Sequence, residues 1–177
     1  MIIPGSVISV ITFPGVIVHE LAHQLFCRLS KVAVIDVCYF RFGNPAGYVR
    51  HEIPKSSAQH ILISVGPFIV NTIIGCLITL PASIQIFMFK DYTNFLYLFL
   101  AWLGVSIVMH SFPSIGDAKA IWEIVKKKET NIFAKIIGTP LALLILLCSL
   151  GSIMWLDLLF GIGVALFIPK LLISILA

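Results

Sequence analysis

The feature that most constrains this chain is a series of long apolar segments that recurs from near the N-terminus to the last residue. Of its 177 residues, 59% are hydrophobic and only 11% are charged, whereas an ordinary soluble domain carries about 25% charged residues. A signal peptide does not explain the pattern, because the apolar segments continue to the C-terminus. The sequence therefore predicts an all-α integral membrane protein.

Five segments are long enough to cross a bilayer, which requires about 20 mostly apolar residues. They cover about 5–29, 61 to between 80 and 89, 95–112, 132–150 and 154–176. Only Gly151 and Ser152 separate the last two, so a tight re-entrant pair is the alternative to two full spans. We expect about five transmembrane helices in a single domain over residues 1–177, with a core at about 7–121 and C-terminal helices at about 132–176.

Two polar regions interrupt the apolar segments. The longer one, about 30–59, has aromatic and β-branched residues on both sides of a turn from Gly43 to Gly47, a pattern typical of a β-hairpin. The shorter one, DAKAIWEIVKKKE, follows the third apolar segment and predicts an amphipathic helix.

The basic residues predict an orientation. Ten of the twelve Lys and Arg residues flank the hairpin or the loop between the third and fourth segments. The positive-inside rule places both regions on the cytoplasmic side, with the N-terminus outside. The opposite side then holds only Lys90, together with Asp91 and Asp157.

The sequence HELAH at positions 19–23 carries the clearest chemical signal. His19 and His23 are four residues apart, so they share one face of a helix and can bind one metal ion. Imidazole suits zinc, and zinc activates a bound water. Glu20 can take a proton from that water as the general base. Because two histidines and a glutamate are costly inside a membrane segment, the motif predicts a functional site with one zinc ion per chain.

A tetrahedral zinc site also needs a third protein ligand. The remaining acids on the predicted cytoplasmic side are Asp36, Glu52, Asp117, Glu123 and Glu129. Asp117 is the best candidate, because Pro113 and Gly116 shape a turn at the end of the third segment, near the depth of the HELAH sequence. The alternative role for Asp117 is to cap the following helix. The residues alone leave these two roles nearly equal.

A third group of residues lies in the second segment, in the sequence GPFIVN. Asn71 carries donors and an acceptor in an apolar setting and therefore needs partners. With Gly66 and Pro67, it is a candidate for binding the substrate backbone or a developing oxyanion. Helix–helix contact, with Pro67 as a kink, is the alternative. His110 is a candidate for orienting a metal ligand, with plain helix packing as its alternative.

Taken together, HELAH, GPFIVN and HSFPSIGDA resemble the motifs of the site-2 protease family of intramembrane zinc metalloproteases, over about residues 7–121. The resemblance implies that His19, His23 and Asp117 bind zinc and that Glu20 is the general base. It also implies an intramembrane endopeptidase that uses zinc-activated water. The orientation predicted from the basic residues places the active site near the cytoplasmic face.

The third motif departs from the usual family pattern, which is close to NxxPxxxxDG. His110 stands in place of the Asn, one residue fewer separates Pro113 from the aspartate, and Ala118 replaces the Gly. The resemblance is therefore to a minimal, divergent member.

Two other functions fit the motif. A prenyl-protein-type membrane protease would use a Glu as third ligand, but the later segments hold only Asp157, on the predicted opposite side. A catalytically silent zinc-binding adaptor would not need Glu20. We expect a transmembrane or signal-peptide-like protein substrate, contact with the lipid bilayer and no nucleic acid; homo-oligomerisation is left open.

Overall fold

The protein is mostly helical, and its computed structural model describes residues 5–176. Within this range the elements are α1 (Gly5–Ile11), α2 (Phe13–Leu29), β1 (Val34–Cys38), β2 (Tyr48–His51), α3 (Ser57–Ser83), α4 (Phe95–Met109), α5 (Ile115–Val125), α6 (Ile132–Gly151) and α7 (Leu156–Leu176). A π-helical turn, Ile84–Met88, extends α3. The predicted helical class with a single hairpin is confirmed.

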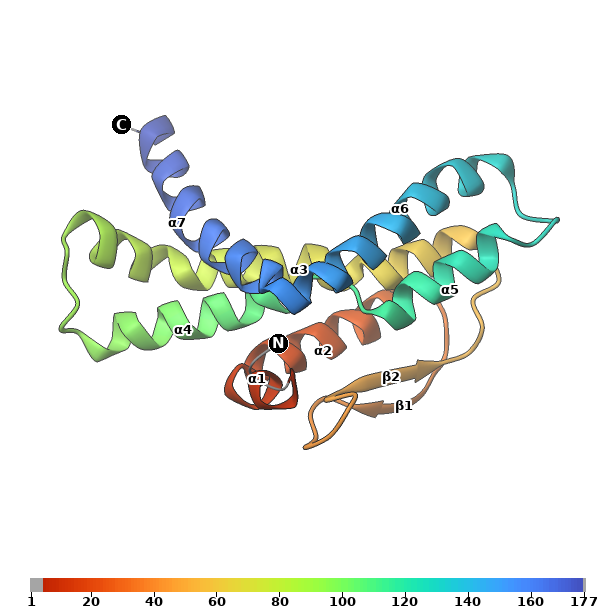
Figure 1. Ribbon diagram of the computed structural model, residues 1–177, viewed down its shortest axis with the longest axis horizontal. Coiled ribbons are helices and arrows are strands. Elements are labelled where there is room, and N and C mark those ends of the chain that lie inside the picture. Colours follow the sequence, from red (N-terminus) through yellow and green to blue (C-terminus); the bar gives the residue numbers. More distant parts are fainter. Residues whose placement is uncertain (1–4, 177) are drawn as a thin grey trace.

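Helix α3 forms the axis around which the other helices pack (Figure 1). Helices α4 and α7 lie along its C-terminal half, and α5 and α6 lie near its N-terminal half. Close packing of α3 on α4 depends on two glycines, since a Cβ at Gly75 would lie 2.8 Å from the carbonyl oxygen of Gly104. Small residues at such crossings are common among membrane helices.

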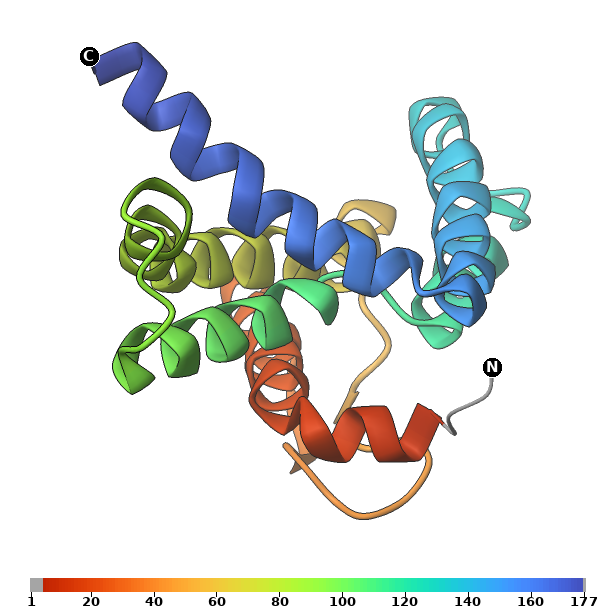
Figure 2. The same cartoon turned by 60° about the vertical axis from the view of Figure 1, so that its left-hand side comes forward.

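The first predicted span is not one helix. Helices α1 and α2 meet at an angle of 89°, and Figure 2 shows α1 turning away from the axis of α2. The bend follows from Pro14 in the first turn of α2, because proline has no N–H for a preceding turn and favours a helix start. The segment predicted as the first span, about 5–29, is therefore either a broken span or a re-entrant loop.

Fewer helices than expected are long and apolar enough to cross a bilayer. In the described part of the chain these are residues 57–87 and α6, and the bent pair α1–α2 adds a third if it counts as one span. Helix α4 has 15 residues, and α7 follows α6 after Trp155, whose φ of 63° is left-handed. Many apolar side chains are exposed on these helices, Leu147 of α6 among them at 65%, as expected for contact with lipid.

The hairpin between α2 and α3 has the predicted antiparallel pairing, with Val37 opposite Val49 and a β-bulge near its start. The Tyr48 hydroxyl donates a hydrogen bond to Asp36 across the two strands, at 2.9 Å. This bond raises the pKa of the Tyr48 hydroxyl, because the phenol donates to a carboxylate that disfavours its charged form. The hairpin rests on the end of α2, where Val34 and Val49 pack against the buried cluster of Cys27, Val32 and Ile63.

Helix α5 is amphipathic, as predicted. Its buried residues Ala118, Ile121 and Val125 pack against Ala142 and Ile145 of α6. This packing fixes the position of the first turn of α5, which carries Asp117.

Candidate metal centre

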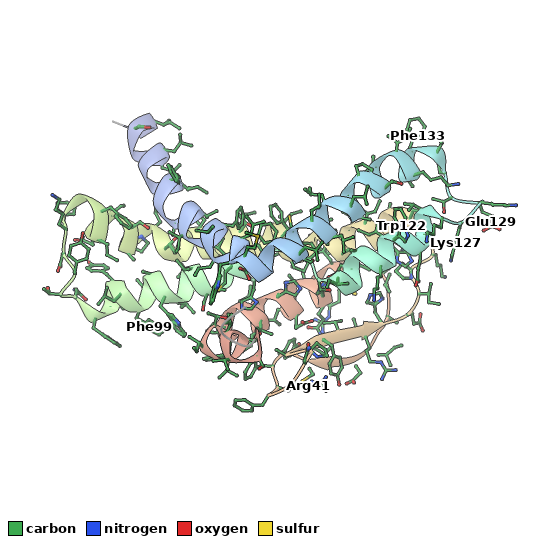
Figure 3. All side chains as sticks on the ribbon, in the orientation of Figure 1. Arg41, Phe99, Trp122, Lys127, Glu129 and Phe133 are labelled. Atoms are coloured by element: carbon green, nitrogen blue, oxygen red, sulfur yellow. The ribbon has the colours of Figure 1, made fainter. Side chains whose placement is uncertain are left out.

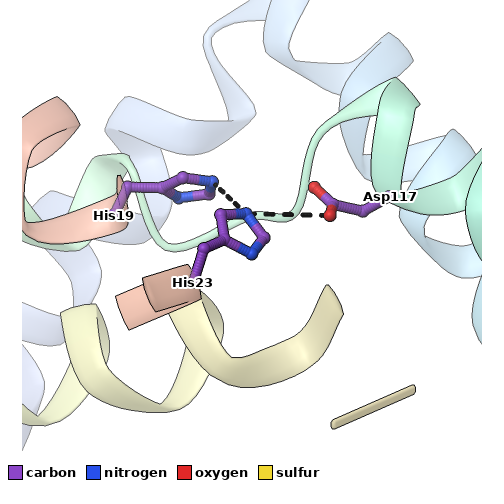
Figure 4. Close-up of side chains that lie close together, drawn as sticks. All are labelled: His19, His23 and Asp117. Carbon is purple, nitrogen blue, oxygen red and sulfur yellow. Dashed lines mark hydrogen bonds and ion pairs between the residues drawn. The ribbon is translucent and has the colours of Figure 1, made fainter. Parts of the chain in front are cut away.

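Two histidines of α2 point their ring nitrogens at the same space. The Nε2 atoms of His19 and His23 lie 3.1 Å apart, and the Oδ1 atom of Asp117 lies 3.7 Å from the Nε2 of His23. One candidate ligand atom from each residue lies within 4.8 Å of the others. Figure 4 shows the three side chains converging from α2 and from the start of α5. The structure thus brings together the three residues that the sequence predicted as ligands.

The other nitrogen of each imidazole is engaged by a main-chain carbonyl. Nδ1 of His19 donates to the carbonyl of His110 at 2.7 Å, and Nδ1 of His23 donates to that of Ile63 at 3.0 Å. In a neutral ring the proton therefore sits on Nδ1, which leaves the Nε2 lone pair of that ring for a metal ion. Such contacts to the far nitrogen are the usual way in which proteins orient a metal-binding histidine.

Both carbonyls are available because the helices leave them without a partner. Residue 67 is proline and has no N–H to bond the carbonyl of Ile63 four residues earlier. His110 follows the last residue of α4, where the carbonyls have no helical partner. Pro67 therefore acts on the site through the main chain, and its ring does not line the cavity described below.

The N-cap of α5 is Ser114 and not Asp117, which lies in the first turn of that helix and completes its capping box. Its Oδ2 accepts hydrogen bonds from the main-chain N and the hydroxyl of Ser114, each at 2.7 Å. The Ser114 hydroxyl in turn accepts from the N–H of Asp117, which completes a capping box at the start of α5. Oδ1 remains free to face His23. The cap thus orients the carboxylate toward the histidine pair.

This donor set fits zinc. Two nitrogen ligands at about 2.0–2.1 Å from a tetrahedral zinc ion lie about 3.3 Å apart, close to the 3.1 Å between His19 and His23. Two lone pairs at this distance repel one another unless a cation or a proton lies between them. Two imidazoles and one carboxylate, with room for a fourth ligand, are a common catalytic zinc set.

Glu20 lies beside the histidines and is only 8% exposed. Within residues 5–176 its carboxylate accepts no hydrogen bond, although it lines the cavity. Gly47 of the hairpin lies directly against it, since a Cβ there would come within 2.7 Å of the Glu20 Cγ and 3.0 Å of its Oε1. The hairpin therefore determines the space in which Glu20 can move.

The three candidate ligands and Glu20 line a cavity of about 740 Å³ between α2, the hairpin turn and the start of α5. Residues 44–49 of the hairpin form one wall. Asp157 lines the same cavity, so the prediction that it lies on the opposite side was wrong. The reason is that α6 ends beside this cavity, with the Ser149 hydroxyl 3.4 Å from the carbonyl oxygen of Pro113.

Asn71 lies behind the histidines and is fully buried. Its Nδ2 lies 3.2 Å from each of the carbonyl oxygens of Gly15, Ile107 and His110. It joins α2, α3 and α4, and it shares the His110 carbonyl with His19. Its Oδ1 has no hydrogen-bond partner among the described residues. Asn71 does not line the described cavity, which favours the helix-contact alternative.

Gly66 is also a packing position. A Cβ there would overlap the ring of Phe26, so the glycine lets α3 approach α2.

His110 does contact the site, through its carbonyl. Its ring is held by Thr12, whose hydroxyl donates to Ile8 and therefore accepts from Nε2 of His110 at 2.8 Å.

No protein-family model, curated protein or solved structure matches this chain.

Sequence reasoning missed Ser114 and Gly47. Ser114 could have been found, since Ser-x-x-Asp before an apolar run is a capping-box signature. Gly47 carries no such signal, because its role arises only when the hairpin folds back on α2.

Proposed function

We propose that this chain is an intramembrane zinc endopeptidase of the site-2 type. The observation that supports this most is the pair of Nε2 atoms 3.1 Å apart, with both rings oriented by carbonyls and Asp117 alongside. In this proposal His19, His23 and Asp117 bind one zinc ion. When bound, zinc supplies Lewis acidity toward water and toward a peptide carbonyl.

Glu20 is the proton carrier in the proposed reaction. Its carboxylate lines the cavity next to both histidines and has no competing hydrogen bond among the described residues. It takes a proton from the attacking water and delivers it to the nitrogen of the leaving amine, as a general base and then a general acid. A silent adaptor would have no use for an acid in this position.

The proposed substrate is a transmembrane or signal-peptide-like segment that unwinds locally. A helical segment offers no free carbonyl, because its backbone groups are bonded internally. Tyr48 and Val49 of β2 line the cavity, and within the described residues β2 pairs only with β1. The other edge of β2 can hold an extended peptide by main-chain hydrogen bonds.

The proposed orientation places the hairpin and the Lys126–Lys128 loop on the cytoplasmic side. The α3–α4 connection, with Thr93, lies at the opposite end of the molecule (Figure 1). Single cysteines in place of Lys127 and Thr93 should react with membrane-impermeant reagents from opposite sides. Labelling of both from one side would contradict this orientation.

The function is tested by cleavage in reconstituted vesicles. A library of transmembrane peptides should be cut by the wild-type protein with zinc, and the Glu20→Gln variant should retain zinc and lose cleavage by at least about 100-fold. Cleavage by Glu20→Gln at the wild-type rate would contradict the proposed mechanism.

A further inference from the structure

A second cavity, of about 690 Å³, lies at the end of the molecule where α5 is connected to α6. It shares no lining residue with the cavity of the metal centre. The first turns of α3 and α6 form two of its sides, and the connection from α5 forms a third. Figure 3 shows Lys127, Glu129 and Phe133 together at this end.

The charged groups around this cavity are mainly basic. Lys55 precedes α3, and Lys127 follows α5; both line the cavity, as does His60 of α3. Glu129 is the one acid in the lining. Among the described side chains, neither lysine has a carboxylate oxygen within 4.0 Å. Two lysines without a carboxylate partner among the described residues therefore line the same cavity.

Main-chain donors reinforce this charge. Helices α3 and α6 have 27 and 20 residues, and both begin at this cavity. The side chains of Ser56 and Asn131 each satisfy one N–H of the first turn, which leaves other first-turn N–H groups for a ligand. The partial positive charge at helix N-termini favours an anion.

The remaining walls are apolar. Ile61 of α3 and Ile137 of α6 line the cavity one to two turns into their helices, and Phe133 lies at its rim. Ile137 is 59% exposed and Phe133 is 71% exposed. Both belong to a helix apolar enough to cross a bilayer. A ligand that fits here has an anionic head and an apolar tail.

We propose that this cavity binds the phosphate headgroup of an anionic phospholipid. Lys55 and Lys127 contact the phosphate, and the acyl chains lie along Ile137 and the neighbouring exposed side chains of α6. A soluble anion would satisfy the lysines and leave the apolar wall uncovered. This site is independent of the zinc chemistry proposed above.

The test compares binding of dioleoyl phosphatidylglycerol and dioleoyl phosphatidylcholine to the purified full chain in detergent, by native mass spectrometry. Phosphatidylglycerol should bind more tightly than phosphatidylcholine and should raise the midpoint temperature of thermal unfolding. Lys55→Gln with Lys127→Gln should weaken its binding by roughly 30-fold, as expected for two basic groups at an anionic surface. Ala58→Trp, which keeps every charge and fills the cavity, should also abolish the preference.

The matched control is Lys119→Gln with Lys128→Gln, which removes the same charge from residues outside the lining. This pair should change binding by less than about 3-fold, since its lysines lie in solvent. An equal loss of phosphatidylglycerol binding in both double variants would mean that the lipid is attracted by net charge alone, and it would overturn the proposed site. So would equal binding of the two lipids, or equal stabilisation by glycerol phosphate at the same concentration.

Discussion

The Nδ1 atom of His23 lies 3.0 Å from the carbonyl oxygen of Ile63, and that oxygen has no helical partner because residue 67 is proline. A proline inside a helix normally costs stability, since it removes a hydrogen bond. Here the missing N–H leaves an acceptor that orients a candidate metal ligand. Pro67 of the GPFIVN sequence therefore helps to set the orientation of the His23 ring, through the carbonyl of Ile63.

Pro67→Ala should weaken zinc binding. Alanine restores the N–H at position 67, which then competes with His23 for the Ile63 carbonyl. Loss of such an orienting contact costs about 10–100-fold in metal affinity, while α3 itself should become no less stable. Zinc affinity is measured by competition with a chelator. The matched control is Pro81→Ala, in the same helix and away from the site; equal zinc affinity in both variants would contradict the role of Pro67.

Asn71→Asp should destabilise the protein more than Asn71→Ala. The Nδ2 of Asn71 lies close to three carbonyl oxygens, and a carboxylate in its place would face them without a hydrogen to donate. Loss of the donors should cost about 1–3 kcal/mol, and more with the added charge. Thermal unfolding of both variants checks this order. If Asn71→Asp is as stable as the wild type and only cleavage falls, Asn71 contacts the substrate instead.

The two roles of Asp117 can be separated by substitution. Ser114→Ala removes the cap and should cost about 1 kcal/mol of stability, with zinc still bound. Asp117→Ala removes the carboxylate from the capping box and from the proposed ligand set, and should lose both stability and most of the zinc. Elemental analysis and thermal unfolding of the two variants give the comparison. Full zinc content in Asp117→Ala would show that the aspartate only completes the capping box.

Gly47→Ala should impair cleavage without loss of zinc. The added Cβ would overlap the Glu20 side chain, so either Glu20 or the hairpin must shift. A shift of about 1 Å in a catalytic group can cost about 100-fold in rate. Gly43→Ala, in the same turn but with 3.9 Å to its nearest neighbour, should cleave normally. Equal cleavage rates in the two variants would show that Gly47 does not determine the position of Glu20.

Residue patterns predicted the elements well and their arrangement less well. The helical class, the hairpin and the pairing of His19 with His23 follow from periodicity, turn residues and motif spacing. The residues alone left the role of Asp117 open, and only the resemblance to the site-2 protease family implied that it joins the two histidines. Hydropathy alone missed the bend before α2, although Pro14 marked it. It also misplaced Asp157, because where α6 ends depends on packing against α5 and not on segment length. The carbonyl partners of the histidines cannot be read from side-chain identity at all.

Elemental analysis of the purified full chain shows whether His19 and His23 hold one zinc ion. We expect about one zinc per wild-type chain, about one for Glu20→Gln, and almost none for His19→Ala with His23→Ala. A wild-type chain that binds no zinc when zinc is supplied, or a double variant that binds as much as the wild type, would contradict this expectation.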